Sequence, residues 1–236
     1  MSEEITKTGL EAIRSFGENE ELFISRDENY IDASLMTETF YSDKEMVKFI
    51  RSIESIVRKS EEYSYFVSFM KNSFDLKRCA VLSNLDMSDN LSLEMHHCPL
   101  TLFDIISIVI NYRFSQSKKV TTFSIADEVI NLHLKGVVGI VPLSISIHQM
   151  VHERSGIIHP AMVSGNYLEF IRSYANGIDE EMFLKIKNFL EISEETLNNS
   201  LKNLHYNPLI LSEETKKLIP TKKEIAELLN YLQIQN

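Results

Sequence analysis

The sequence predicts a predominantly α-helical α+β protein with a small β-containing centre. Two observations lead to this prediction. Apolar residues recur at helical spacing behind N-capping residues along most of the 236-residue chain, whereas short stretches near its middle have the patterns of β-strands. The hydrophobic content of 44% is sufficient to bury a full core, so we expect one compact globular unit rather than a disordered chain.

The first region, residues 1–75, is expected to be helical. Residues 5–16 have helical spacing, and Ser42 precedes an amphipathic helix that extends to about Lys59. Ser60 repeats this N-terminal signal. The helix that it introduces carries an aromatic stripe, composed of Tyr63, Phe66, Phe69, Met70 and Phe74. A stripe at this spacing is typical of core packing, and we prefer that interpretation to a platform for stacking bases.

The central region, residues 76–160, is expected to contain the β structure. Cys79–Leu85 and Leu91–His96 have strand patterns and are joined by a turn-rich link, which predicts a hairpin. A third strand is predicted over residues 137–141. It should end at Pro142, because proline cannot donate a hydrogen bond to a sheet.

Helices are expected around this centre. An insertion over residues 100–135, between the hairpin and the third strand, has the spacing of two amphipathic helices. In the C-terminal region, residues 161–236, Asp179 is expected to cap one helix, and Thr221 with Glu224 forms a capping box before the last helix. The helical regions would therefore wrap a small central unit.

Four histidines are placed where they can meet at one ion. The hairpin ends in His96 and His97, which leave the strand on opposite sides. A helix is expected to follow the third strand through Arg154, and it carries His148 and His152 four residues apart on one face. With one strand-end histidine, this pair would supply three ligands and leave a coordination position open, as catalytic metal sites do. The other strand-end histidine would be free to act as a base.

These stretches resemble the two halves of a ββα-metal, or HNH-type, nuclease finger. The closest variant is that of the colicin-type DNases, in which a strand ends in Glu-x-His-His and a helix carries His-x-x-x-His. The matching residues are Glu94, His96, His97, His148 and His152. The resemblance includes the valine-proline-leucine run before the helix, here residues 141–143. Ser144 and Ile147 replace the two knuckle cysteines of many relatives, and the family's asparagine falls near Gly139 and is absent.

The resemblance implies a ββα-metal core, made of the hairpin, a strand and the His-x-x-x-His helix, in a metal-dependent endonuclease. The enzyme would hydrolyse phosphodiesters of nucleic acid, DNA rather than RNA. The implied roles are His97 as general base, with Glu94 also in the catalytic site, and His96, His148 and His152 as ligands of one divalent cation. Zinc, magnesium, manganese and nickel are not distinguished. The distribution of the family also suggests a phage or mobile-element origin.

Other residues are weaker candidates. Glu94 points to the same side as His96, where it could orient that histidine, bind the ion or remain a solvated carboxylate. Contacts with substrate phosphate are expected from Lys118, Lys119, Arg154 and His159. His159 has two further interpretations, a metal ligand or a packed surface residue. His133 and His205 have no partner in the sequence and are expected to be ordinary hydrogen-bonded histidines.

The composition bears on partners and location. A net charge of −10 opposes nonspecific attraction to a polyanion, which counts against a nuclease. The two cysteines and the absence of an apolar N-terminal run indicate a reducing compartment, so we expect a cytoplasmic protein with no membrane partner.

The acidic charge and the missing asparagine favour an alternative to the nuclease. In it, the same fold keeps its metal as a structural element but cuts nothing, and the protein acts in interaction or assembly. A third possibility, an acidic inhibitor of a nucleic-acid-binding protein, leaves the histidines unexplained.

Overall fold

The computed structural model describes residues 42–74, 76–82, 92–153, 157–193, 195–196 and 219–235. Within these ranges the protein is mostly helical and has one two-stranded antiparallel sheet, which confirms the predicted helical α+β class. The predicted helix over residues 5–16 and the histidine at 205 lie outside them. No helix in this described part is long and apolar enough to span a membrane.

The two N-terminal helices begin where their capping residues predict. Helix α2 (Asp43–Lys59) follows Ser42, whose side chain accepts a hydrogen bond from the Glu45 amide, and α3 (Glu61–Ser73) follows Ser60, whose hydroxyl accepts one from the Tyr63 amide. The buried members of the aromatic stripe are Tyr63, Phe66, Met70 and Phe74. The prediction that this stripe packs in the core is therefore confirmed.

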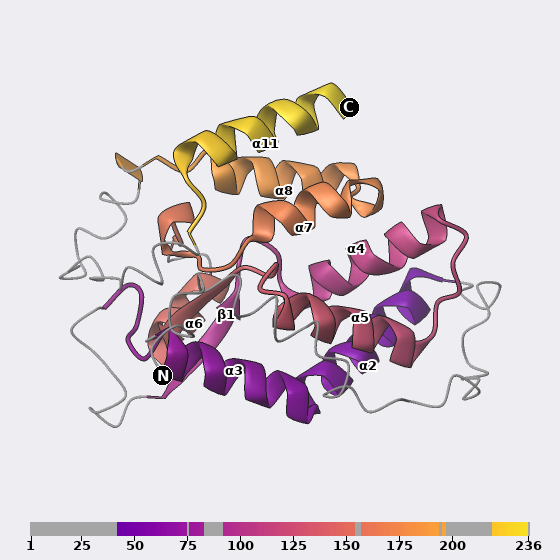
Figure 1. Cartoon of the computed structure of the whole chain (residues 1–236), viewed down its shortest axis with the longest axis horizontal. Helices are drawn as coiled ribbons and strands as arrows, with labels where there is room; N and C mark the ends of the chain where they lie inside the picture. Colours follow the sequence, from indigo (N-terminus) through magenta and orange to yellow (C-terminus); the bar gives the residue numbers. More distant parts are fainter. Residues whose placement is uncertain are drawn as a thin grey trace, which may run out of the picture.

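The predicted insertion forms two helices, α4 (Leu102–Ser115) and α5 (Thr122–Leu134). Each begins with a capping box, in which Thr101 pairs with Asp104 and Thr121 pairs with Ser124. Both helices pack against α2, and Figure 1 shows these three helices gathered on one side of the molecule.

The two strands of the sheet are distant in the sequence and were not predicted to pair with each other. Strand β1 (Leu93–His97) pairs antiparallel with β2 (Ile140–Ser144), from Leu93 opposite Ser144 to His97 opposite Ile140. The predicted hairpin partner is wrong in its described part, because residues 79–82 form no strand. Instead the Ala80 amide donates to the Pro142 carbonyl at 2.8 Å, so this segment touches β2 rather than β1. Residues 83–85 lie outside the described ranges.

The prediction that Pro142 ends a strand is also wrong, because β2 continues through it. Ile140 exchanges its backbone hydrogen bonds with Ser164, on the edge of β2 that faces away from β1. Pro142, two residues further, faces the same edge, and it lies opposite Met95 in the sheet. Its missing N–H therefore removes no hydrogen bond from the β1–β2 ladder.

The C-terminal half adds helices around this sheet. Helix α6 (Ile145–His152) follows β2 directly; the short turn η4 (Pro160–Met162), helix α7 (Tyr167–Ser173), the turn η5 (Ala175–Gly177), α8 (Glu180–Leu190) and α11 (Lys222–Gln235) come next. Asp179 caps α8, and Thr221 and Glu224 form the predicted capping box of α11. In Figure 1, α7, α8 and α11 lie together above the sheet. One buried core contains side chains from Phe49 of α2 to Leu228 of α11.

Candidate metal centre

Strand β1 separates its two histidines into different environments. Leu93, Met95 and His97 are buried, whereas Glu94 is exposed and His96 is half-buried. This alternation is the period of a strand with one face on the core. The expectation that His96 and His97 leave on opposite faces is confirmed: His96 faces the side of Glu94, and His97 faces the core.

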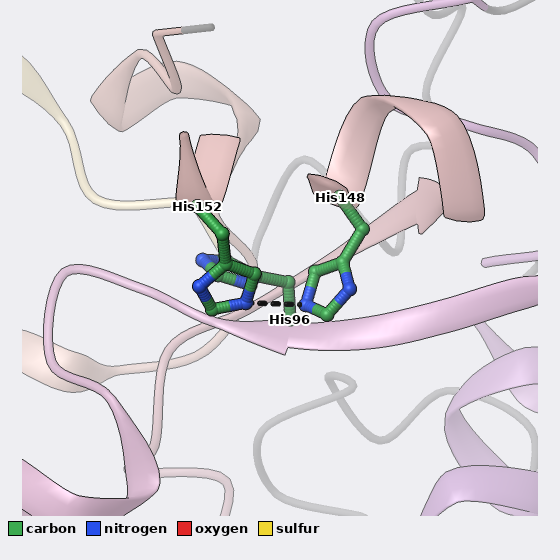
Figure 2. A group of neighbouring side chains, drawn as sticks. All are labelled: His96, His148 and His152. Carbon is green, nitrogen blue, oxygen red and sulfur yellow. Dashed lines mark hydrogen bonds between the residues drawn. The ribbon is translucent and has the colours of Figure 1, made fainter. Parts of the chain in front are cut away.

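His96 meets the two histidines of α6. Figure 2 shows the three rings gathered between α6 and β1, with His148 and His152 projecting from the same helix. The Nε2 atoms of His148 and His152 lie 3.0 Å apart. One ligand atom from each of the three rings lies within 4.8 Å of the others, with no ion present. We call this group, His96, His148 and His152, the three-histidine cluster.

The local fold explains why these rings converge. Helix α6 starts at the residue after β2 ends, so the β1–β2 pairing fixes its first turn relative to β1. Ile147 is buried and anchors the helix on the core, which turns the neighbouring face with His148 and His152 toward the half-buried side of β1. The i, i+4 spacing then brings both rings over His96.

Burial favours the neutral form of two of the three histidines, His96 and His148. Burial, followed by the neighbouring His148 and His152, lowers the pKa of His96 from 6.5 to about 4. Burial also lowers the pKa of His148, against the opposing effect of Glu94. Neutral imidazoles present lone pairs, and only this form binds a metal. The surroundings of His96 and His148 therefore favour the form that can bind a metal.

Glu94 contacts His148 rather than His96. Its Oε2 lies 2.5 Å from Nδ1 of His148. A carboxylate at this position accepts the Nδ1–H of the imidazole, so the lone pair is on Nε2, the atom that faces His152. Histidine ligands of metals commonly donate their other ring N–H to a carboxylate in this way.

The cluster borders a pocket of about 390 Å³, lined by its three histidines together with Glu94, Arg58, Lys71 and neighbouring residues. Three imidazole ligands leave at least one position of a tetrahedral ion open, as in catalytic zinc sites. A set of nitrogen donors suits zinc, nickel, copper or iron, whereas magnesium prefers oxygen. The residues present therefore fit a divalent transition metal better than they fit magnesium.

His97 lines the same pocket but does not join the cluster. It is 5% exposed, and its Nε2 lies 2.8 Å from Nε2 of His133, which is fully buried. Nδ1 of His133 lies 2.7 Å from the carbonyl oxygen of Val129 and must donate to it, so His133 Nε2 accepts and His97 Nε2 donates. Burial lowers the pKa of both residues, that of His133 to about 4. We call His97 and His133 the buried histidine pair.

His133 is hydrogen-bonded in the core, as expected, but its partner was not foreseen. The two residues of the pair are 36 positions apart in the sequence, and no spacing rule connects them. The rings of Tyr63 and Phe66 pack against His133 edge-on, at centroid distances of 5.2 and 5.3 Å. The aromatic stripe on α3 was the one sequence signal for this contact, because it predicts a buried surface against which its rings pack.

Three of the four residues expected to contact phosphate, Lys118, Lys119 and His159, do not line the pocket. Lys118 and Lys119 are exposed in the connection between α4 and α5, which Figure 1 places on the opposite side of the molecule from α6. His159 is nearly buried, and its Nδ1 accepts a hydrogen bond from the Ala161 amide at the start of η4. Arg154 lies outside the described residues.

Two cations that sequence reasoning missed line the pocket instead. Arg58 is in the last turn of α2, and Lys71 is in the last turn of α3. Lys71 Nζ donates to the Leu93 carbonyl at 3.2 Å. Basic residues near helix C-termini are ordinarily explained by the helix dipole, so their position in the sequence gave no reason to connect them with the histidines.

The missing asparagine has a steric explanation. A Cβ atom at Gly139 would lie 2.0 Å from the Cys98 carbonyl oxygen and 2.9 Å from Cγ1 of Val163. The segment after β1 thus passes too close for any side chain at this position. The backbone also bonds there, because the Cys98 amide donates to the Gly139 carbonyl at 3.1 Å.

Comparison with known proteins gives one informative result. No curated protein and no solved structure matches the chain. The family model described as bacteriophage G278-like virion protein matches residues 2–224, which confirms the expected phage association. Because this match spans almost the whole chain, the protein belongs to the bacteriophage G278-like virion protein family.

Proposed function

We propose that this protein is a metal-binding structural component of the virion, in which one divalent transition-metal ion fastens α6 to β1. The observation that carries the proposal is the convergence of one ligand atom each from His96, His148 and His152 to within 4.8 Å. In a tetrahedral site with bonds of about 2.1 Å, two ligand atoms are about 3.4 Å apart. The His148 and His152 Nε2 atoms, now 3.0 Å apart, would separate slightly, and ligand atoms that are up to 4.8 Å apart would move closer together.

Three features support a structural rather than a catalytic role. His97, the base that the nuclease resemblance implies, faces the core and shares its Nε2 with His133. Gly139 leaves no space for the family's asparagine. The net charge of −10 opposes binding to nucleic acid. Membership of a virion protein family is consistent with a role in assembly.

The test measures metal content and metal-dependent stability together. Purified protein should contain about one equivalent of a transition metal, and adding zinc or nickel to metal-free protein should raise its melting temperature. His148→Ala and His152→Ala should abolish both effects, whereas Gln149→Ala, an exposed substitution on the same helix, should preserve them. Wild-type protein that takes up no metal and whose melting is unmoved by zinc or nickel would refute the proposal.

A single-metal endonuclease is the second candidate. The open coordination position and the cations Arg58 and Lys71 at the pocket favour it, because both would attract a phosphate. The order of a strand, its antiparallel partner and a His-x-x-x-His helix also matches the ββα-metal pattern. In this candidate His97 remains the proposed general base, acting through its Nδ1, since Nε2 donates to His133.

Cleavage assays separate the two candidates. Wild-type protein should be incubated with plasmid DNA and with RNA over zinc, nickel, manganese and magnesium, beside the His148→Ala variant. Metal-dependent cleavage that His148→Ala abolishes would establish the nuclease. If His97 is its base, His97→Ala should then reduce the rate by about 10² to 10⁴ with metal content unchanged. The structural proposal expects no cleavage with any metal.

A further inference from the structure

The three-histidine cluster lacks a fourth protein ligand within the described part of the chain. The group of potential metal ligands there comprises only His96, His148 and His152. Glu94 is already engaged with Nδ1 of His148. Structural metal sites are normally closed by four protein ligands. A structural metal at this cluster is therefore incomplete in one copy of the described chain.

The open side of the cluster is positively charged. Arg58 and Lys71 line the pocket there, and neither forms an ion pair with a described residue; Lys71 donates only to the Leu93 carbonyl. Against these two cations the pocket has one carboxylate, Glu94, and a bound divalent ion would add two positive charges.

These charges select the chemistry of the fourth ligand. An anionic oxygen donor would complete the coordination and pair with Arg58, because a guanidinium binds a carboxylate in a bidentate geometry. A thiolate from another copy is excluded, since both cysteines of the chain are buried. The chain contains 34 acidic residues, so a carboxylate is the donor that each copy supplies most readily.

We propose that a carboxylate from a neighbouring copy of this chain completes the metal site, so that the ion joins two copies of the virion protein. The proposal rests on the metal-binding function above. A positively charged pocket on a protein of net charge −10 is a complementary target for an acidic surface of the same protein. A carboxylate located away from the pocket would make a head-to-tail contact between the two copies.

The experiment is sedimentation velocity on the full-length protein over a range of concentrations, with EDTA or with one equivalent of zinc, beside a direct measurement of bound zinc. Wild-type protein should associate only with zinc. His148→Ala should remain unassociated in both conditions. Arg58→Gln should retain its zinc but associate roughly tenfold more weakly, because a charge-assisted hydrogen bond is lost. Lys119→Gln, an exposed cation outside the pocket, should behave as wild type.

Each other outcome overturns the inference in a distinguishable way. Zinc-loaded wild-type protein that stays monomeric would show that water, a small anion or the same chain supplies the fourth ligand, and would leave the metal-binding proposal intact. Association that persists in His148→Ala would show nonspecific metal bridging. Wild-type protein that binds no zinc would refute the metal-binding proposal itself. Association of equal strength in Arg58→Gln would refute the carboxylate contact.

Discussion

The protein holds two histidine pairs with nearly the same contact and opposite surroundings. The Nε2 atoms are 3.0 Å apart in His148–His152 and 2.8 Å apart in His97–His133. The first pair lies at a pocket, next to His96 and a carboxylate. The second is buried, although His97 also lines this pocket. In this pair, His133 Nδ1 donates to the Val129 carbonyl and the two Nε2 atoms are hydrogen-bonded to each other. A short distance between two imidazole nitrogens therefore does not identify a metal site; the metal proposal for the first pair rests on the third ring, His96, and on the pocket.

Adjacent residues of one strand are divided between these two environments. His96 and His97 differ only in the face of β1 on which they lie, and that face decides their chemistry. His96 is available to an ion, whereas His97 contributes to core packing and to one buried hydrogen bond. This contrast has measurable consequences, which we take from the largest expected effect to the smallest.

The largest effect is expected at the buried pair. His133→Ala should lower the free energy of unfolding by about 3 to 5 kcal/mol, because it leaves a cavity and deprives the His97 N–H of its acceptor. Urea denaturation in EDTA measures this loss. In the same buffer His152→Ala, on an exposed side chain, should change stability by less than about 0.5 kcal/mol. Similar losses in the two variants would remove the distinction between the pairs.

The buried pair should also make stability depend on pH. Burial lowers the pKa of His133 from 6.5 to about 4, so between these values the unfolded chain binds a proton that the folded protein does not. The contribution of His133 to the free energy of unfolding is therefore complete above pH 6.5, decreases as the pH is lowered and is fully lost near pH 4. The loss is on the order of 3 kcal/mol for His133 alone.

Denaturation in EDTA between pH 7.5 and about pH 5 isolates this effect from the titration of most carboxylates. The double variant His97→Leu, His133→Leu should have a flatter pH dependence over this range. His152→Ala should retain most of the wild-type slope. A double variant with the full wild-type slope would mean that other groups carry the pH dependence.

The sequence was sufficient for elements that local chemistry determines. The predicted caps at Ser42, Ser60, Asp179 and Thr221 define where their helices begin, and each begins there. The shared helix face of His148 and His152 and the opposite faces of His96 and His97 were also predictable, because the i, i+4 rule and strand alternation are local geometry. The meeting of His96 with the helix pair was implied by the nuclease resemblance.

What the sequence could not provide were contacts between distant segments. The partner of β1 is β2, more than 40 positions away, whereas the sequence pattern predicted the closer segment Cys79–Leu85 as its partner. Pairing depends on which edges the tertiary fold brings together, and a hydrophobic pattern does not encode that choice. For the same reason, the sequence did not predict that Arg58 and Lys71 line the pocket or that His133 contacts His97.

Metal binding should stabilise the protein through the three-histidine cluster alone, with no contribution from the buried histidine pair. At a free zinc concentration of 100 times Kd the gain is about 2.7 kcal/mol. His133→Ala should show this full gain, although its starting stability is lower, whereas His148→Ala should show none. Thermal unfolding with and without zinc gives both values. A reduced gain in His133→Ala at the same saturation would show that the two faces of β1 are coupled.

The smallest effect is expected from Glu94, which contacts the cluster without belonging to it. Its carboxylate lies 2.5 Å from Nδ1 of His148 and is proposed to hold the tautomer that presents Nε2 to the metal. Glu94→Gln should weaken metal affinity by about 10- to 100-fold, the usual effect of losing such a partner. The loss in free energy of binding is about 1.4 to 2.7 kcal/mol. Glu153→Gln, an exposed carboxylate at the end of α6, is the matched control.

Cobalt substitution distinguishes orientation from direct ligation by Glu94. If Glu94 only orients His148, the cobalt-loaded Glu94→Ala protein should keep the visible absorption bands of the wild type, and only the cobalt concentration needed to reach them should rise. If Glu94 is itself a ligand, the coordination number changes and so do the position and intensity of the bands. In the first case, Glu94 would have the same role in the three-histidine cluster that the Val129 carbonyl has in the buried histidine pair. Each would accept the Nδ1–H of a histidine and so fix its tautomer.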